Sequence, residues 1–164
     1  MNEEQTAIST LYHRKVKDLL ETTTVKDSYV EKSEKIENVF VAFETKNHLW
    51  VVDDIVSLRV IGVITESDTI QLLAPAYTPL QSFDKPSLQS FQYGLPLTAQ
   101  EVMSSQPIMA HTEDPIVDVL MKMKQHQITQ LPVVDETDRL IGEITLRRLL
   151  IEYIKQQTEL QQKK

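Results

Sequence analysis

Two threonines, Thr65 and Thr145, stand where the sequence predicts that a strand turns into a helix, and each offers a hydroxyl group there. Each threonine ends a duplicated string, Arg-Val-Ile-Gly-Val-Ile-Thr in residues 59–65 and Arg-Leu-Ile-Gly-Glu-Ile-Thr in residues 139–145. The first turn of a helix has free backbone N–H groups and the positive end of the helix dipole, which together favour an anion such as phosphate. Both strings are therefore candidate anion-binding turns.

The residue three places after each threonine differs between the copies. In the first copy it is Asp68, and Thr-x-x-Asp is close to a capping box, in which the two side chains satisfy each other's backbone N–H groups and bind nothing else. In the second copy it is Arg148, preceded by Arg147. A cation in the first turn of a helix is disfavoured by about 0.3–1 kcal/mol unless an anion or an acidic neighbour offsets it. The arginines therefore indicate either a phosphate ligand or pairing with surface carboxylates such as Glu152 or Asp138.

The duplication extends to the elements that position these residues. The chain has 164 residues and three glycines, two of which occupy matching places in the duplicated strings, so the sequence predicts two copies of one structural unit. Apolar periodicity predicts the order strand, helix, strand, strand, helix in both copies. The elements expected are a leading helix over 6–21, a helix capped by Ser33, strands over 49–52 and 58–65, a helix over 68–73, a helix capped by Asp114 with Pro115 at its first position, strands over 131–134 and 140–145, and a long helix from Leu146.

Composition excludes several classes of function. A net charge of −7 disfavours a nucleic-acid surface, and the lack of cysteine excludes disulfides and thiolate metal sites. No apolar run approaches the roughly 20 residues that cross a bilayer, so we expect a cytoplasmic protein with no membrane association. The four histidines have no ligand spacing, and no acid, base and nucleophile stand together, so neither a metal site nor an enzyme is expected.

Leu131-Pro132-Val133-Val134-Asp135, followed by a turn and Ile141-Gly142-Glu143-Ile144-Thr145, resembles a cystathionine-beta-synthase (CBS) domain. Residues 49–53 and 61–68 resemble a more diverged copy, with Trp50 where the family usually has proline. The resemblance implies an α/β (α+β) fold of two CBS repeats related by a pseudo-twofold axis, with packed sheets and flanking helices. The boundaries expected are a helical extension in 1–15, repeat 1 in 16–73, an irregular proline-containing linker in 74–99, repeat 2 in 100–155 and a polar helix end in 156–164.

The resemblance also implies ligand-binding positions in clefts between the repeats. Thr65 and Asp68 would contact phosphate and ribose, and a nucleotide whose ribose is held by Asp68 could place its phosphates near Thr145, Arg147 and Arg148. Adenine slots map to two further sets of residues. In the first copy these are Val25, His48 and Trp50, and in the second copy Ile108, Met109, Ile128, Thr129 and Pro132. Trp50 is equally a candidate core residue that replaces the proline.

Two functions follow from this resemblance. The first is a regulatory module that binds an adenine nucleotide, of the AMP, ADP, ATP or S-adenosylmethionine class, and signals to an unidentified partner protein, with homodimerisation expected and no obligatory cofactor. The second is a ligand-free dimerisation or interaction module for an enzyme or transporter. Loss of the aspartate from one copy and the tryptophan at position 50 favour the second function, so the sequence leaves both open.

Overall fold

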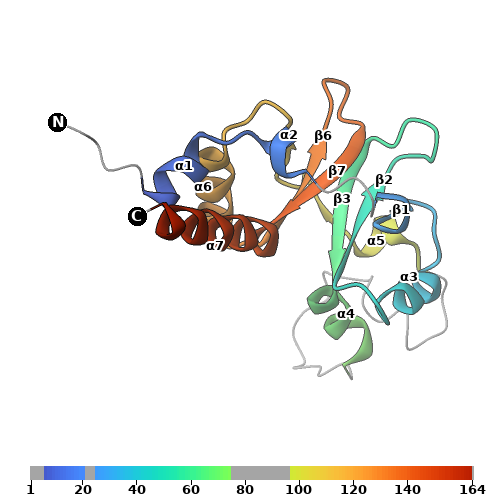
Figure 1. Ribbon diagram of the computed structural model, residues 1–164. Helices are drawn as coiled ribbons and strands as arrows, with labels where there is room; N and C mark the ends of the chain where they lie inside the picture. Colours follow the sequence, from blue (N-terminus) through green and yellow to red (C-terminus); the bar gives the residue numbers. More distant parts are fainter. Residues whose placement is uncertain (1–5, 21–24, 75–96, 164) are drawn as a thin grey trace. The chain divides into compact units, whose positions relative to one another are not determined.

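A computed structural model of the chain describes residues 6–20, 25–74 and 97–163. The chain divides into two compact units. Unit 1 contains residues 1–25 together with 108–164, and unit 2 contains residues 26–107. Each unit has its own sheet and its own apolar core, so each is described separately (Figure 1).

Unit 2 is built on a four-stranded sheet in the order β1-β2-β3-β4. Strand β1 pairs with β2 in parallel, and β2, β3 and β4 pair in antiparallel fashion. Helix α3 connects β1 to β2, and α4 follows β3 directly (Figure 1). The elements are β1 (Tyr29–Glu31), α3 (Ile36–Ala42), β2 (His48–Val52), β3 (Val60–Thr65), α4 (Glu66–Leu73), α5 (Ala99–Val102) and β4 (Ser104–Ser105), preceded by the 3-10 turn η1 (Val25–Asp27).

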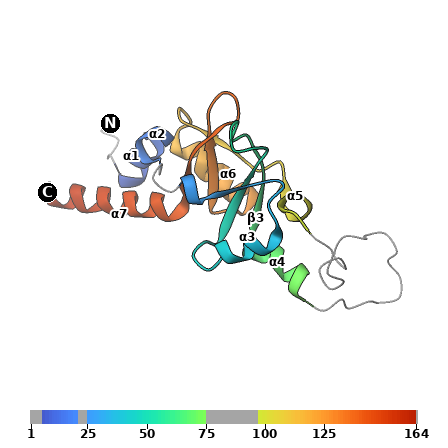
Figure 2. The same cartoon turned by 90° about the vertical axis from the view of Figure 1, so that its right-hand side faces the viewer.

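Unit 1 repeats this plan on a three-stranded sheet in the order β5-β6-β7. Strand β5 pairs with β6 in parallel, and β6 pairs with β7 in antiparallel fashion. Helix α1 lies beside α7, which continues well past the sheet (Figure 2). The elements are α1 (Ala7–His13), α2 (Val16–Leu19), β5 (Ala110–His111), α6 (Ile116–His126), β6 (Gln130–Val134), β7 (Leu140–Thr145) and α7 (Leu146–Gln162).

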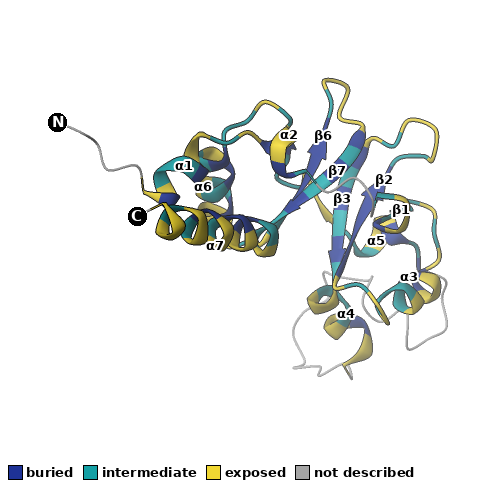
Figure 3. Ribbon diagram, viewed as in Figure 1, coloured by how far each residue is buried: buried dark blue, intermediate teal, exposed yellow. Residues whose placement is uncertain are grey.

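The central hairpins of the two units have the same register. In β2 and β3, His48 lies opposite Thr65 and Val51 lies opposite Gly62. In β6 and β7, Gln130 lies opposite Thr145, and Val133 opposite Gly142 in the same way. The strands alternate buried and half-buried positions along β3 and β7, as a sheet with one face in the core requires (Figure 3). The predicted strand, helix, strand, strand, helix order is therefore confirmed in both copies.

A helix from the start of the chain completes unit 1. The Ile116 N–H at the start of α6 donates to the Arg14 carbonyl (2.8 Å), and the Val16 N–H of α2 donates to the Asp114 carbonyl (3.0 Å). Lys15 forms an antiparallel bridge with Pro115 between them. The buried side chains of Leu11, Val16 and Leu19 join the core that α6, α7 and the β5-β6-β7 sheet form. Residues from the first twenty positions of the chain therefore belong to the core of unit 1.

Unit 2 is completed in the corresponding way by residues that precede repeat 2. The Ile36 N–H at the start of α3 donates to the Leu97 carbonyl (3.0 Å), and the Ala99 N–H of α5 donates to the Glu34 carbonyl (2.8 Å). Lys35 and Thr98 form the bridge. A short helix at the start of each repeat, α2 or α5, thus belongs to the unit that contains most of the other repeat, and this reciprocal exchange is not visible in the duplicated strings.

Several element boundaries differ from the sequence prediction. The leading helix expected over 6–21 is interrupted at Arg14, whose backbone is extended because Lys15 bridges to Pro115. Ser33 does not cap α3, since Lys35 occupies the N-cap position and Ser33 is exposed. The second strand of the first copy begins at Val60 rather than at position 58, because Leu58 adopts a left-handed conformation with φ of 52°.

The start of α6 also differs from the prediction. Pro115, expected at the first helical position, is the N-cap residue, and α6 begins at Ile116. Asp114 does not cap the helix; its Oδ2 accepts hydrogen bonds from the His111 N–H (3.0 Å) and from the Lys122 ammonium group (3.1 Å). Most of the predicted linker, 75–96, lies outside the residues that the structure describes.

Candidate functional site

The strand-to-helix junction of unit 2 is closed by its own side chains. The Thr65 N–H donates to Asp68 Oδ2 (2.7 Å), and the Thr65 hydroxyl donates to the same oxygen (3.0 Å). This is the capping box that the spacing allows. Both hydrogen bonds end on Oδ2, so the cap does not use Oδ1 of Asp68.

His48 and its neighbours lie next to this junction. His48 is opposite Thr65 in the sheet, and the Glu66 N–H at the start of α4 donates to the Asn47 carbonyl (3.2 Å). The Nδ1 atom of His48 is 2.7 Å from Asn47 Oδ1, and its ring meets the ring of Trp50 edge-on at 5.0 Å. Trp50 is only 2% exposed, as the packing alternative requires. A base that stacks on Trp50 has to displace the residues that cover it.

The junction of unit 1 has the same backbone but a different cap. The Thr145 hydroxyl accepts a hydrogen bond from the Arg148 N–H (3.2 Å), so Thr145 is the N-cap of α7. The Leu146 N–H donates to the Thr129 carbonyl (2.7 Å), as Glu66 does to Asn47 in unit 2. Gln130, opposite Thr145, takes the place of His48. The sequence prediction missed Gln130 as a candidate, although aligning the two copies from Thr129 onward identifies it.

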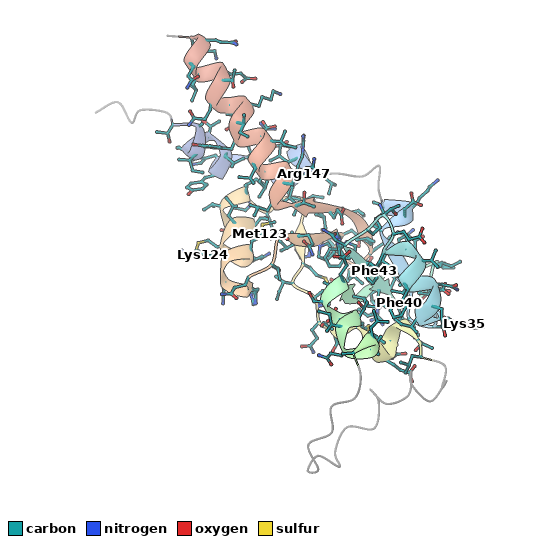
Figure 4. All side chains as sticks on the ribbon, turned by 90° about the horizontal axis from the view of Figure 1, so that it is seen from below. Lys35, Phe40, Phe43, Met123, Lys124 and Arg147 are labelled. Carbon is teal, nitrogen blue, oxygen red and sulfur yellow. The ribbon has the colours of Figure 1, made fainter. Side chains whose placement is uncertain are left out.

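Two positive charges stand in the first turn of α7 without an acidic residue in that turn. Arg147, which is labelled in Figure 4, is exposed. Arg148 is half-buried. The predicted pairing of these arginines with Glu152 is wrong, because Glu152 Oε1 lies 3.0 Å from Arg14 Nη1. Within residues 6–20, 25–74 and 97–163, neither Arg147 nor Arg148 forms a salt bridge. Seventeen residues of α7 place a strong dipole behind these uncompensated charges, so an anion would stabilise this turn.

The remaining candidates of the second copy line unit 1 in two groups. Pro132 is buried in β6, opposite Glu143, and Ile128 and Ile108 pack against the core of unit 1. The Met109 carbonyl accepts a hydrogen bond from the Lys122 ammonium group (3.0 Å), and Thr129 is exposed beside the junction. Val25 begins η1 at the boundary of unit 1. Thr129, Thr145 and Arg148 are therefore the candidates that hydrogen bonds bring together here, whereas the apolar ones pack against the sheet and core.

Other kinds of site are not found in the part of the chain that the structure describes. No group of three or more histidine or acidic side chains there could hold a metal ion. None of its helices combines the length and the apolar character of a membrane span.

Comparison with known proteins identifies the second half of the chain directly. A family model described as the CBS domain matches residues 99–155. Among curated proteins, the chain is 27% identical over 131 residues to a homoserine O-acetyltransferase of Methanosphaera stadtmanae; the match covers 80% of this chain and 22% of that protein. The chain thus spans less than a quarter of the curated relatives it matches.

Solved structures extend the likeness to both halves. A CBS domain pair in complex with 5′-methylthioadenosine and S-adenosyl-L-methionine is 23% identical, with a TM-score of 0.60, 87% of this chain covered and 97% of that chain. The protein CBSX2 in complex with AMP is 18% identical, with a TM-score of 0.65, 86% of this chain covered and 97% of that chain. The predicted α/β fold, with two sheets and flanking helices, is thereby confirmed.

Proposed function

We propose that the chain is a tandem pair of CBS domains that acts as a regulatory module, binding an adenine nucleotide and signalling to a partner protein. The CBS domain match over residues 99–155 and the shared fold of both units with solved CBS domain pairs support this. CBS domain pairs of the same fold are known with S-adenosyl-L-methionine, 5′-methylthioadenosine and AMP. These three ligands share the adenine and ribose groups and differ in the substituent on the ribose 5′ carbon, which is a phosphate, a methylthio group or the sulfonium of methionine. The charges at the two junctions therefore decide which member of the class this chain prefers.

The observation that carries the proposal is the pair of arginines at the start of α7. Arg147 and Arg148 are held in the turn whose dipole disfavours them, and no acidic residue of that turn compensates them. Such a turn gains stability from a bound phosphate, because both the arginines and the positive end of the α7 dipole then face an anion. In the equivalent turn of unit 2 the charge is opposite, since Glu66 and Asp68 occupy it. A carboxylate there suits ribose hydroxyls and disfavours phosphate.

Within unit 1 we therefore assign a phosphate contact to Thr145, Arg147 and Arg148, and within unit 2, separately, a contact with ribose hydroxyls to Asp68. The preferred ligands are then AMP, ADP or ATP rather than S-adenosylmethionine. A ligand with different affinities for two conformations of the module would shift its equilibrium between them, and this shift is the signal that a partner reads.

Isothermal titration calorimetry against AMP, ADP, ATP and S-adenosylmethionine tests the proposal. We expect Arg148→Ala to weaken ATP binding roughly tenfold or more, as removal of a charge-assisted contact does, and to leave S-adenosylmethionine almost unchanged. Lys155→Ala, which removes an exposed charge farther along α7, is the matched control. Asp68→Asn should weaken all four ligands, and thermal melting separates that effect from the loss of the cap. Absence of heat with every ligand at millimolar concentration would refute nucleotide binding.

A ligand-free dimerisation or interaction module is the second candidate. The closed capping box at Thr65 and the burial of Trp50 favour it, because both residues already have intramolecular roles. Light scattering coupled to size exclusion measures whether the chain forms the homodimer that we expect under either function. A partner that binds with equal affinity in the presence and absence of AMP and ATP would favour this candidate over the sensor.

A further inference from the structure

The hairpin between β2 and β3 carries two apolar side chains into solvent. Ile55 is 61% exposed and Val56 is 79% exposed, and the end of the hairpin that contains them, here called the apolar tip, is drawn as exposed in Figure 3. β-Branched side chains lose little conformational freedom when they are covered, since their χ1 angle is already restricted. The apolar tip is therefore suited to contact with another apolar surface.

Hydrogen bonds from one aspartate fix the backbone of the apolar tip. Asp54 Oδ1 accepts from the N–H groups of Val56 (2.9 Å) and Ser57 (2.8 Å), and Asp54 Oδ2 accepts from the Ser57 hydroxyl (2.7 Å). The Ile55 N–H donates to Glu31 Oε1 (3.0 Å), which ties the tip to the end of β1. The hydrogen bonds from Ser57 and Val56 lower the pKa of Asp54, so the carboxylate keeps its charge at neutral pH. The tip is thus ordered before any contact forms, and binding costs less conformational entropy.

Ionic contacts hold the base of the same hairpin. The Lys32 ammonium group and the Arg59 guanidinium group both bond the carboxylate of Asp53, the latter at 2.9 Å. The Asp53 N–H donates to the Arg59 carbonyl (2.9 Å) and closes the hairpin. Five charged residues therefore surround the tip, three acidic and two basic, which leaves a small excess of negative charge.

The equivalent hairpin of unit 1 is closed by the same backbone hydrogen bond and has no apolar tip. The Asp135 N–H donates to the Arg139 carbonyl (3.0 Å), as the Asp53 N–H does to Arg59, so the backbone bond that closes the hairpin is the same in both copies. Asp135 Oδ1 accepts from the Thr137 N–H (2.8 Å), a kind of contact that Asp54 makes in unit 2. Between them lie only Glu136, Thr137 and Asp138, which are polar and exposed. The hairpin of unit 2 is two residues longer. The two extra residues and the two apolar side chains thus occur in the same hairpin. Since the hairpin of unit 1 closes without them, the fold of a hairpin requires neither.

We propose that the apolar tip is a docking element that inserts into an apolar pocket, rimmed by basic residues, on the partner protein. The inference rests on the proposed function in one respect, the existence of that partner. A lipid surface is disfavoured, because two apolar side chains anchor a protein weakly and the excess of carboxylates repels anionic headgroups. Contact between the tips of two copies is disfavoured as well, because both tips carry the same excess of carboxylates and repel each other. The net charge of −7 favours a basic partner.

Photo-cross-linking followed by affinity measurement tests the proposal on the full chain. p-Benzoylphenylalanine placed at Val56 should cross-link, in cells, a protein that the same group placed at Thr137 does not. With that protein purified, Val56→Ser should weaken its binding roughly tenfold or more, because a buried valine is lost from the contact. Val41→Ser, which changes an exposed valine of the same unit, is the matched control and should leave affinity unchanged. Asp54→Ala should weaken binding several-fold although it leaves both apolar side chains in place.

Four outcomes would overturn the inference. The first two are identical cross-linked proteins from positions 56 and 137, and equal losses of partner affinity in the Val56→Ser and Val41→Ser variants. The other two are binding of the chain to phosphatidylglycerol vesicles, or association of the chain with itself, if Val56→Ser abolishes either of them. Calorimetry with ATP on the Val56 variant separates this inference from the proposed function. If the Val56→Ser variant binds ATP normally but no longer binds the partner, the docking role is supported. If the wild-type protein binds neither ATP nor a partner, the proposed regulatory function is refuted.

Discussion

Substitution of Leu11 by alanine should destabilise a unit that lies far from it in the sequence. Leu11 belongs to α1 and is 3% exposed, packed in a core shared with Leu131, Ile144 and Leu149. Buried leucine-to-alanine changes cost about 2–5 kcal/mol, from lost transfer free energy and the cavity that remains. A leucine in an N-terminal extension that merely lay on the surface would cost less than about 0.5 kcal/mol. The two expectations differ enough for one measurement to separate them.

Hydrogen exchange followed by mass spectrometry resolves which unit is affected. Amides of α6 and α7 should exchange roughly 30-fold faster or more in Leu11→Ala, since about 1.4 kcal/mol corresponds to a factor of ten. Amides of β2 and β3 should not change, because they belong to unit 2. Ile8→Ala is the matched control, as it alters the same helix at a side chain that is 39% exposed. Equal effects of the two substitutions, or equal effects on both units, would refute the shared core.

Three further predictions concern single sites. Gly62→Ala should lower the free energy of unfolding, measured by chemical denaturation, by about 1–3 kcal/mol, because the new Cβ would lie 2.3 Å from Met103 Sδ. Adding Met103→Ala to this variant should recover part of the loss. Hydrogen bonds from Lys15 and Lys17 lower the pKa of Glu113 to about 2. These ion pairs therefore stabilise the folded state above the usual glutamate pKa, and the stabilisation is lost as the pH falls toward 2. NMR titration should give a higher midpoint for the Glu113 carboxyl in Lys15→Ala than in the wild type. Gln156→Met should change the free energy of unfolding by less than about 1 kcal/mol, because it removes both a buried Oε1 with no partner among the described residues and the long hydrogen bond from Nε2 to Glu152 Oε1 (3.3 Å). A loss of more than about 2 kcal/mol in chemical denaturation would contradict this.

The elements around the candidate site were predictable because local patterns determine them. The duplicated strings give β3 and β7, and in both copies the threonine that ends the string is the N-cap of the next helix. The strand over 140–145 and the helix from Leu146 agree with the prediction residue for residue. Apolar periodicity and turn chemistry act within a few residues, so one sequence is enough to read them.

The boundaries that were wrong depend on contacts between distant residues. Arg14 interrupts the leading helix because its neighbour Lys15 bridges to Pro115, about a hundred positions away, and α3 begins only after Lys35 because that residue bridges to Thr98. The predicted pairing of the arginines with Glu152 was wrong for the same reason. Arg14, which follows α1 in the sequence, forms the ion pair with Glu152 instead. No local pattern in the sequence contains this information.

The division of the chain has a mechanical consequence. Residues near both ends belong to unit 1, and unit 2 is an insertion between the two parts of that unit. A force that pulls the two ends apart therefore acts first across the contacts of α1 and α2 with α6 and α7. Unit 2 carries no load until those contacts shear. Any domain attached at either end would thus be coupled mechanically to the arginine-bearing unit, while the unit with the hydrophobic hairpin stays unstrained.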